Sequence, residues 1–95
     1  MAALHAVLIE VDVAGVDREE GLHALREHLV PAIAELPGFR SGTWLTGSED
    51  GRGFSLTVWD SEAAARTMAE RFTAGTPPAG ASVVRCEVRE VAATA

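Results

Sequence analysis

The sequence predicts a single α+β domain, residues 1–95, with a ferredoxin-like fold and the element order βαββαβ. The first reason is that four short segments alternate between apolar and polar residues, as strands do. The second is that two amphipathic helical patterns separate them in the order that this fold requires. The third is that 95 residues are too few for a second domain. Such a domain has an antiparallel sheet with two helices on one face, so the uncovered face is the expected functional surface.

The first strand is expected in HAVLIEVDV, residues 5–13, and the first helix follows it. Asp17 is the expected N-cap of this helix, with Glu20 three residues later as its capping-box partner. The helix has an apolar stripe at spacings of three and four, made of Leu22, Leu25, Leu29, Ile33 and Leu36. Pro31 lies within the helix and should kink it, because proline cannot donate a backbone hydrogen bond.

The second and third strands are expected at residues 39–46 and 53–59. Asp50-Gly51 between them predicts a two-residue hairpin turn, which would pair Leu45 with Leu56 and Thr43 with Val58. The second helix is expected within DSEAAARTMAERF, capped by Asp60 or Ser61. The last strand is expected in SVVRCEVREV.

The direction of the side chains on the middle strands determines the surface of the open sheet face. The most apolar row of the third strand is Phe54, Leu56 and Val58, and it is expected to face the helices. Trp59 then points to the open face. The same alternation puts further residues on the expected open face, namely Arg40, Gly42, Trp44, Thr46, Ser55, Thr57, Leu8, Glu10, Asp12, Arg85, Glu87 and Arg89. The last strand is expected to turn another row toward the core, namely Val84, Cys86 and Val88.

An open face with two indoles and paired charges has two interpretations. Two sheets could meet face to face in a homodimer, or a hollow beside Gly42 could bind a flat aromatic molecule inside that dimer. Both remain open at this stage.

The octapeptide RGFSLTVW, residues 52–59, resembles the RNA-contacting segment of an RNA-recognition motif. In that motif the third and fifth residues face away from the helices, whereas Phe54 and Leu56 are expected to face toward them. The formal net charge of −6 also disfavours binding to phosphates, so no nucleic-acid partner is expected.

No membrane partner is expected either, because no apolar run approaches ~20 residues. The single Cys86 fits a reducing cytoplasm and is expected to be an inert buried thiol.

The three histidines do not predict a metal site. His23 and His28 are five residues apart, which is about 140° around an α-helix, so they are expected to point to different sides.

The segments LPGFRSGTWL and DGRGFSLTVWDSEAAARTMAE resemble the dimeric α/β-barrel superfamily that includes the antibiotic biosynthesis monooxygenase (ABM) domains. The resemblance runs from about Leu4 to Val91. It is strongest at Pro37-Gly38-Phe39 and at Trp59-Asp60-Ser61-Glu62. It implies a homodimer, and it implies the fold more specifically than the function, since the superfamily hosts several activities.

The characterised monooxygenases of this group oxidise polyphenolic substrates with molecular oxygen and no bound cofactor. By this resemblance Trp44 and Trp59 would sandwich an aromatic ring, with Gly42 and Thr57 lining the site. The resemblance further assigns three catalytic candidates, namely Glu10 as the base and Arg40 or Arg85 as the cation that stabilises the anion. The alternative is a non-catalytic dimeric module that binds a ligand or has a structural role.

Haem degradation is not expected. The haem-degrading relatives use an Asn in the first strand and a His after the second helix, and this chain has neither, although Trp59 matches their Trp.

Overall fold

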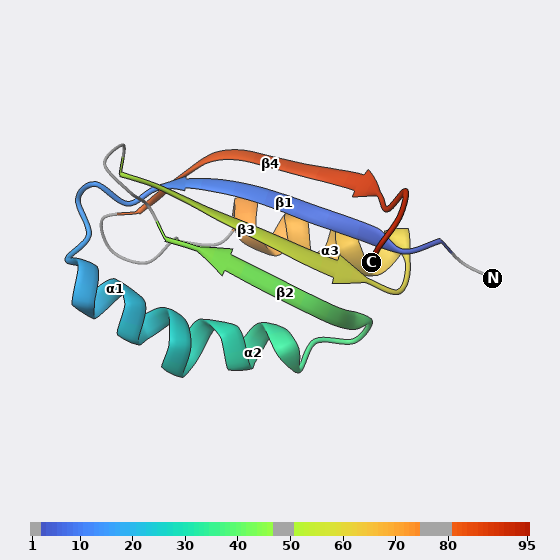
Figure 1. Cartoon of the computed structure of the whole chain (residues 1–95), viewed down its shortest axis with the longest axis horizontal. Coiled ribbons are helices and arrows are strands. Elements are labelled where there is room, and N and C mark those ends of the chain that lie inside the picture. The colour runs from blue at the N-terminus through green and yellow to red at the C-terminus, as the bar shows by residue number, and fades with distance from the viewer. Residues whose placement is uncertain (1–2, 47–50, 75–80) are drawn as a thin grey trace.

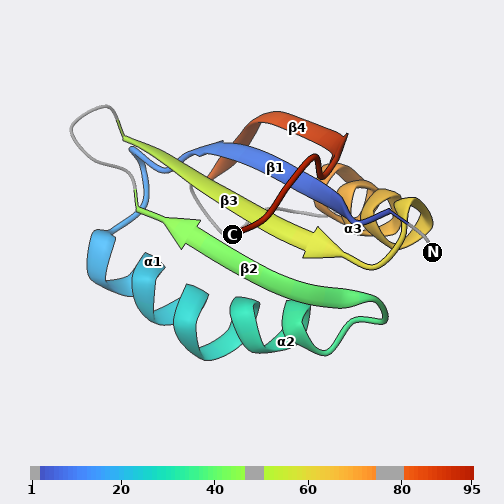
Figure 2. The same cartoon turned by 45° about the vertical axis from the view of Figure 1, so that its right-hand side comes forward.

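The computed structural model describes residues 3–46, 51–74 and 81–95, which form one four-stranded antiparallel sheet and its helices (Figures 1 and 2). The elements along the chain are β1 (His5–Asp12), α1 (Arg18–Ala24), η1 (Leu25–Leu29), α2 (Val30–Ala34), β2 (Phe39–Leu45), β3 (Arg52–Trp59), α3 (Glu62–Ala74) and β4 (Ser82–Glu90). The strand order is β2-β3-β1-β4, and the predicted α+β ferredoxin-like fold is therefore confirmed. Within the described residues, no helix has the length and apolar character needed to cross a membrane.

The two helical segments cover different parts of the same sheet face. The α1–η1–α2 segment packs through α2 on the edge strand β2, whereas α3 packs on β4, β1 and β3 (Figure 1). The buried core joins both segments, since it contains Ile33 of α2, Ala65 and Met68 of α3, and Val7, Ile9 and Trp59 of the sheet.

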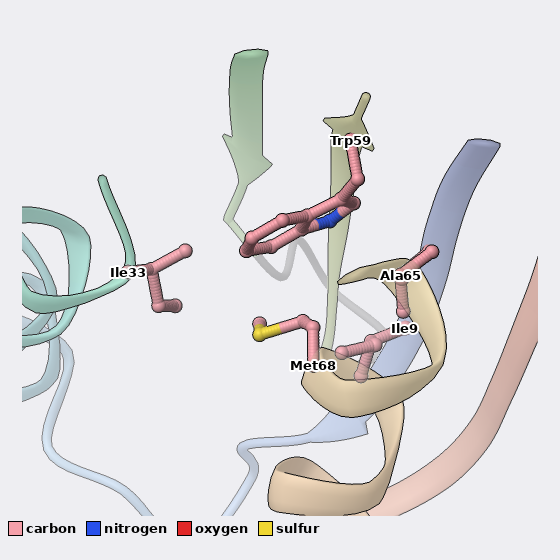
Figure 3. Close-up of a cluster of buried hydrophobic side chains, with 6 residues drawn as sticks. Ile9, Ile33, Trp59, Ala65 and Met68 are labelled. Carbon is pink, nitrogen blue, oxygen red and sulfur yellow. The ribbon is translucent and has the colours of Figure 1, made fainter. Parts of the chain in front are cut away.

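Trp59 is the largest fully buried side chain, at 1% exposure. Figure 3 shows its indole directed toward Ile33, with Met68 below the ring. One aromatic side chain thus fills the space where the two helical segments and the sheet meet.

The predicted orientation of β3 is wrong. Ser55, Thr57 and Trp59 face the helices, and Phe54, Leu56 and Val58 face the open side. The register with β1 requires this, because Val7 lies opposite Thr57 and Ile9 lies opposite Ser55 on the core side. The β-branched β1 residues and the Trp59 indole fill the core, so small hydroxyl residues suffice between them.

The side chains of β2 also face the opposite way from the prediction, because β2 pairs with β3. Gly42 lies opposite Thr57 and Trp44 lies opposite Ser55, so both face the helices rather than the open side. The hairpin register is also two residues away from the prediction, with Leu45 opposite Phe54 and Thr43 opposite Leu56. β2 ends at Leu45 and β3 begins at Arg52, and Asp50 of the predicted turn lies outside the described residues.

A register shift between β1 and β4 shows that one predicted core residue of β4 is wrong. The β1–β4 register shifts between Glu10 and Val11, so that Val11 pairs with Val83. Val83 consequently packs against the core, whereas Val84 is 47% exposed and does not belong to it. Cys86 and Val88 do face the helix layer, as predicted.

The two sequence motifs that carry the family resemblance contact each other. Gly38 has φ +87° and accepts a hydrogen bond from the backbone N–H of Asp60 through its carbonyl oxygen (2.8 Å). A Cβ on Gly38 would lie 2.7 Å from the Cβ of Ala64, so glycine satisfies both the backbone conformation and the close approach. Ser61 then caps α3 by accepting from the N–H of Ala64 (3.1 Å).

Candidate functional site

The four predicted substrate-binding residues do lie together, but on the helix-facing side of β2 and β3. Gly42 and Thr57 are cross-strand partners. The Nε1–H of Trp59 donates to Oγ1 of Thr57 over 2.9 Å, so this buried indole nitrogen has its partner within the same strand. Thr57 is fully buried at 0% exposure.

The indole of Trp44 covers Gly42 of its own strand. A Cβ on Gly42 would be 2.5 Å from Cη2 and 2.6 Å from Cζ3 of the Trp44 indole, and 3.4 Å from Cε1 of Phe39. The hollow expected beside Gly42 is therefore filled by the Trp44 ring. Glycine is needed at this position because any larger side chain would occupy the same space.

Phe39 lies next to both the Trp59 ring and the Gly42 position that the Trp44 ring covers. Its ring lies edge-on to that of Trp59, with ring centroids 5.5 Å apart and an interplanar angle of 85°. We call Phe39, Trp44 and Trp59 the aromatic row. Trp59 is buried within it, and Phe39 and Trp44 are half-buried, so Trp44 is the indole that an incoming molecule can reach first.

Glu10 and Arg85, two of the predicted catalytic residues, lie on the opposite side of the sheet. They are cross-strand partners on the open face, where that prediction placed them. Glu10 Oε1 lies 3.6 Å from Nη2 of Arg85, and its Oε2 lies 3.3 Å from Nη1 of Arg52. The Glu10 carboxylate is thus held between two guanidinium groups, not isolated among apolar residues.

The charges continue along β4. Nε of Arg85 lies 3.4 Å from Oε2 of Glu87, and Arg89 contacts the other oxygen of Glu87. We call this set the charge row, made of Glu10, Arg52, Arg85, Glu87 and Arg89. The sequence interpretation missed Arg52, because Arg52 has the same parity as Phe54, which was expected to face the helices.

The predicted catalytic and substrate-binding residues therefore do not form one site. The backbone of the sheet separates Glu10 and Arg85 from the aromatic row, because successive side chains of a strand point to opposite faces. Arg40, the third predicted catalytic residue, is exposed on the edge strand β2 at the irregularity between Phe39 and Ser41.

Apolar side chains surround the charge row on the open face. Leu56 is 46% exposed and Leu45 is 59% exposed, while Leu8, Phe54 and Val58 are half-buried beside them. Phe54 and Leu56 thus do face the open side, as the corresponding residues do in an RNA-recognition motif. The expected absence of RNA binding now depends only on the net charge of −6 and stays a prediction.

Cys86 lies beside a shallow depression of about 270 Å³ between α3 and β4. Burial, followed by the nearby charge of Glu87, raises the pKa of the Cys86 thiol above its ordinary value. The thiol is half-buried rather than fully buried, and a raised pKa keeps it in the less reactive neutral form.

No family model matches the chain, and no curated protein matches it. Solved structures with the same fold include a heme-degrading protein of Mycobacterium tuberculosis, at 24% identity and a TM-score of 0.60, with 98% of this chain and 97% of that one covered. A monooxygenase-like protein of Shewanella loihica superimposes at 22% identity and a TM-score of 0.65, with 99% of both chains covered.

A third similar structure is a Streptomyces coelicolor monooxygenase, the product of ActVA-Orf6, in complex with nanaomycin D. It has 19% identity and a TM-score of 0.59, with 99% of this chain and 91% of that one covered. These similarities extend over almost the entire chain. The chain therefore has the fold of the ABM-like domains of the dimeric α/β-barrel superfamily.

Proposed function

We propose that this protein binds a flat, largely apolar aromatic molecule on the helix-facing side of its sheet, with the Trp44 indole as the first contact. The observation that carries this proposal is the aromatic row, in which the half-buried Trp44 lies over Gly42 and Phe39 lies edge-on to the fully buried Trp59. Aromatic rings offer such a ligand stacking and edge contacts, and the Thr57 hydroxyl is the polar group already fixed beside them.

The reaction that we propose for this site is cofactor-independent oxygenation of a phenolic substrate. A methylene group flanked by aromatic rings reacts with O₂ to give a carbonyl group and one molecule of water. Both C–H bonds of the methylene are broken, and the substrate supplies all the electrons. The aromatic row would hold the substrate ring and exclude water from the reacting carbon.

Glu10 and Arg85 have no role in this proposal, because they lie across the sheet from the aromatic row. Arg40 is kept as the candidate cation for the substrate anion, since it is exposed and adjacent in sequence to Phe39, the first residue of the row. The S. coelicolor monooxygenase supports the choice of ligand class, because its structure contains nanaomycin D.

The alternative is a non-catalytic module in which the aromatic row is only core. Two observations favour it, since Trp59 and Thr57 are both fully buried and the indole N–H already donates to the Thr57 hydroxyl. The two functions differ at Trp44. A bound ligand must contact its indole, whereas an aromatic row with only a structural role does not require that indole to be exposed.

We further propose that two copies of the chain pair through their open sheet faces. The exposed apolar residues Leu45 and Leu56 lie beside a charge row of alternating sign. A two-fold axis brings each surface against its own copy, so such a row can pair with itself while the leucines become buried.

Tryptophan fluorescence tests the ligand proposal. In a Trp59→Phe variant the only indole is Trp44, and titration with anthrone- and quinone-like compounds should quench its emission in a saturable manner. In a Trp44→Phe variant the response should be weaker, because Trp59 is buried. No saturable response in the wild type would contradict ligand binding.

An oxygen electrode and mass spectrometry then test the reaction. The enzyme proposal expects O₂ consumption and a product that has gained one oxygen and lost two hydrogens. Saturable binding without either change would support the non-catalytic alternative.

A further inference from the structure

The helix after β1 contains a π turn at η1, and Pro31 accounts for its position. The N–H of Val30 donates to the carbonyl of Leu25, five residues earlier, rather than to the residue four earlier. In a regular α-helix the ring of Pro31 would clash with the carbonyl of Glu27, four residues before it. Widening the preceding turn relieves this clash, so the kink expected at Pro31 takes the form of a π turn.

The π turn changes which side chains are neighbours. Residues five apart diverge by about 140° on an α-helix, but they lie nearly above one another where the hydrogen bonds run from i to i+5. The ring centroids of His23 and His28 are accordingly 6.2 Å apart, with an interplanar angle of 85°. The prediction that these two rings point to different sides is therefore wrong.

We propose that His23 and His28 together bind a divalent transition-metal ion such as Zn²⁺, Ni²⁺ or Cu²⁺. Imidazole nitrogen is a preferred ligand of these ions, and both side chains are exposed on the surface of the helix. With metal–nitrogen distances of about 2.0–2.1 Å, two rings on a tetrahedral ion have centroids roughly 5 Å apart. A small rotation of either exposed side chain would close the present separation.

The proposed site has two protein ligands and is completed by water. Among the described residues there is no group of three or more His, Cys, Asp or Glu side chains that could hold a metal ion. The ion is therefore readily exchanged and has open coordination positions, unlike a structural zinc site. The ion joins His23, two residues before η1, to His28 within η1, so its binding stabilises the π turn over the regular α-helix.

Calorimetric titration of the tag-free protein with Zn²⁺ tests the proposal. The wild type should bind one ion per chain. His23→Gln and His28→Gln should each weaken binding on the order of a hundredfold, because a chelate is reduced to a single ligand. The matched controls are His5→Gln and Cys86→Ser, which remove the other imidazole and the thiol and should leave the affinity unchanged.

Pro31→Ala tests the geometry without removing either ligand. This change allows a regular α-helix, which separates the two imidazoles, so Zn²⁺ affinity should fall although His23 and His28 remain. Adding Glu27→His to this variant should restore binding, because residues 23 and 27 are neighbours on a regular α-helix. Circular dichroism would verify that every variant is folded.

Absence of Zn²⁺ binding in the wild type would overturn the proposal. So would binding that survives in both histidine variants or is unchanged in Pro31→Ala. None of these outcomes bears on the aromatic ligand, since the His pair lies on the helix surface and outside the aromatic row.

Discussion

At the residue scale, the contact between Trp44 and Gly42 determines how accessible the candidate site is. Gly42→Ala would place a Cβ 2.5 Å from the indole, so the ring must swing away from the strand. We expect a red shift of the Trp44 emission in the Trp59→Phe background and a loss of about 1 kcal/mol of stability. Fluorescence with acrylamide quenching and chemical denaturation measure the two effects.

The matched control for Gly42→Ala is Ser41→Ala, which changes the neighbouring exposed residue on the other sheet face. It should change neither emission nor stability. An unchanged Trp44 emission in Gly42→Ala would mean that the indole does not lie on Gly42.

The buried hydrogen bond from Trp59 to Thr57 is the second feature at this scale. Thr57→Val keeps the shape of the side chain but leaves the indole N–H without a partner at a fully buried position. We expect a loss of about 1–3 kcal/mol in the free energy of unfolding.

A double-mutant cycle isolates this bond. In the Trp59→Phe background, Thr57→Val should change stability by no more than about 0.5 kcal/mol, because no donor remains. Equal costs in both backgrounds would show that the loss came from packing alone. Urea denaturation of the four proteins provides the cycle.

Cys86 gives the pH-dependent prediction. Burial is the larger cause that raises the pKa of the Cys86 thiol, and the charge of Glu87 is the smaller one. Because only the thiolate reacts, modification should be slow at neutral pH and accelerate as the pH rises. Glu87→Gln removes one of the two causes and should move the rate profile to lower pH. The rate of reaction with an aromatic disulfide reagent is the measurement, and a profile that does not move would exclude the influence of Glu87.

At the scale of the elements, the start of α1 depends on one side-chain cap. Oδ1 of Asp17 accepts from the backbone N–H of Glu20 over 2.9 Å, as the sequence predicts. Asp17→Ala should cost about 1 kcal/mol, measured by thermal or urea denaturation. Asp17→Asn keeps the acceptor and should cost much less; an equal cost would assign the effect to the charge at the helix N-terminus instead.

The helical segment after α1 shows why the effect of a proline such as Pro31 on a helix is hard to predict from sequence. The apolar stripe from Leu22 to Leu36 and Pro31 are compatible with a kink, a break or a change of helical pitch. The chain adopts a π turn, and this local choice moves His28 next to His23. Only the hydrogen-bond pattern distinguishes these possibilities.

At the scale of the whole molecule, the proposed homodimer depends on the open sheet face. Leu56→Arg places a charge at an exposed apolar position, so light scattering should show the mass falling from two chains to one. Ala63→Arg adds the same charge on the exposed surface of α3 and should leave the mass unchanged. A wild-type chain that is monomeric at all concentrations would contradict the homodimer.

The reversal of β2 and β3 also belongs to this scale. The row Phe54, Leu56 and Val58 is more apolar than Ser55, Thr57 and Trp59, which suggested that it faces the core. Both rows of β3 contain large apolar side chains, with Trp59 on the inner row and Phe54, Leu56 and Val58 on the outer one, so composition alone does not identify the inner row. The wrong orientation of these strands placed Trp44 and Trp59 on the open face in the prediction. It therefore combined residues of the aromatic row and of the charge row into one site.

The sequence by itself determined the order of the elements, the cap at Asp17 and the sides of β1, because each depends on residues close together in the chain. The core-facing side of β3 was decided by its pairing with β1, and that of β2 by its pairing with β3. Strand register is a contact between distant segments, and a shift of one residue turns every side chain over. The location of Trp44 and Trp59 beneath the helices was therefore decided only by the tertiary structure.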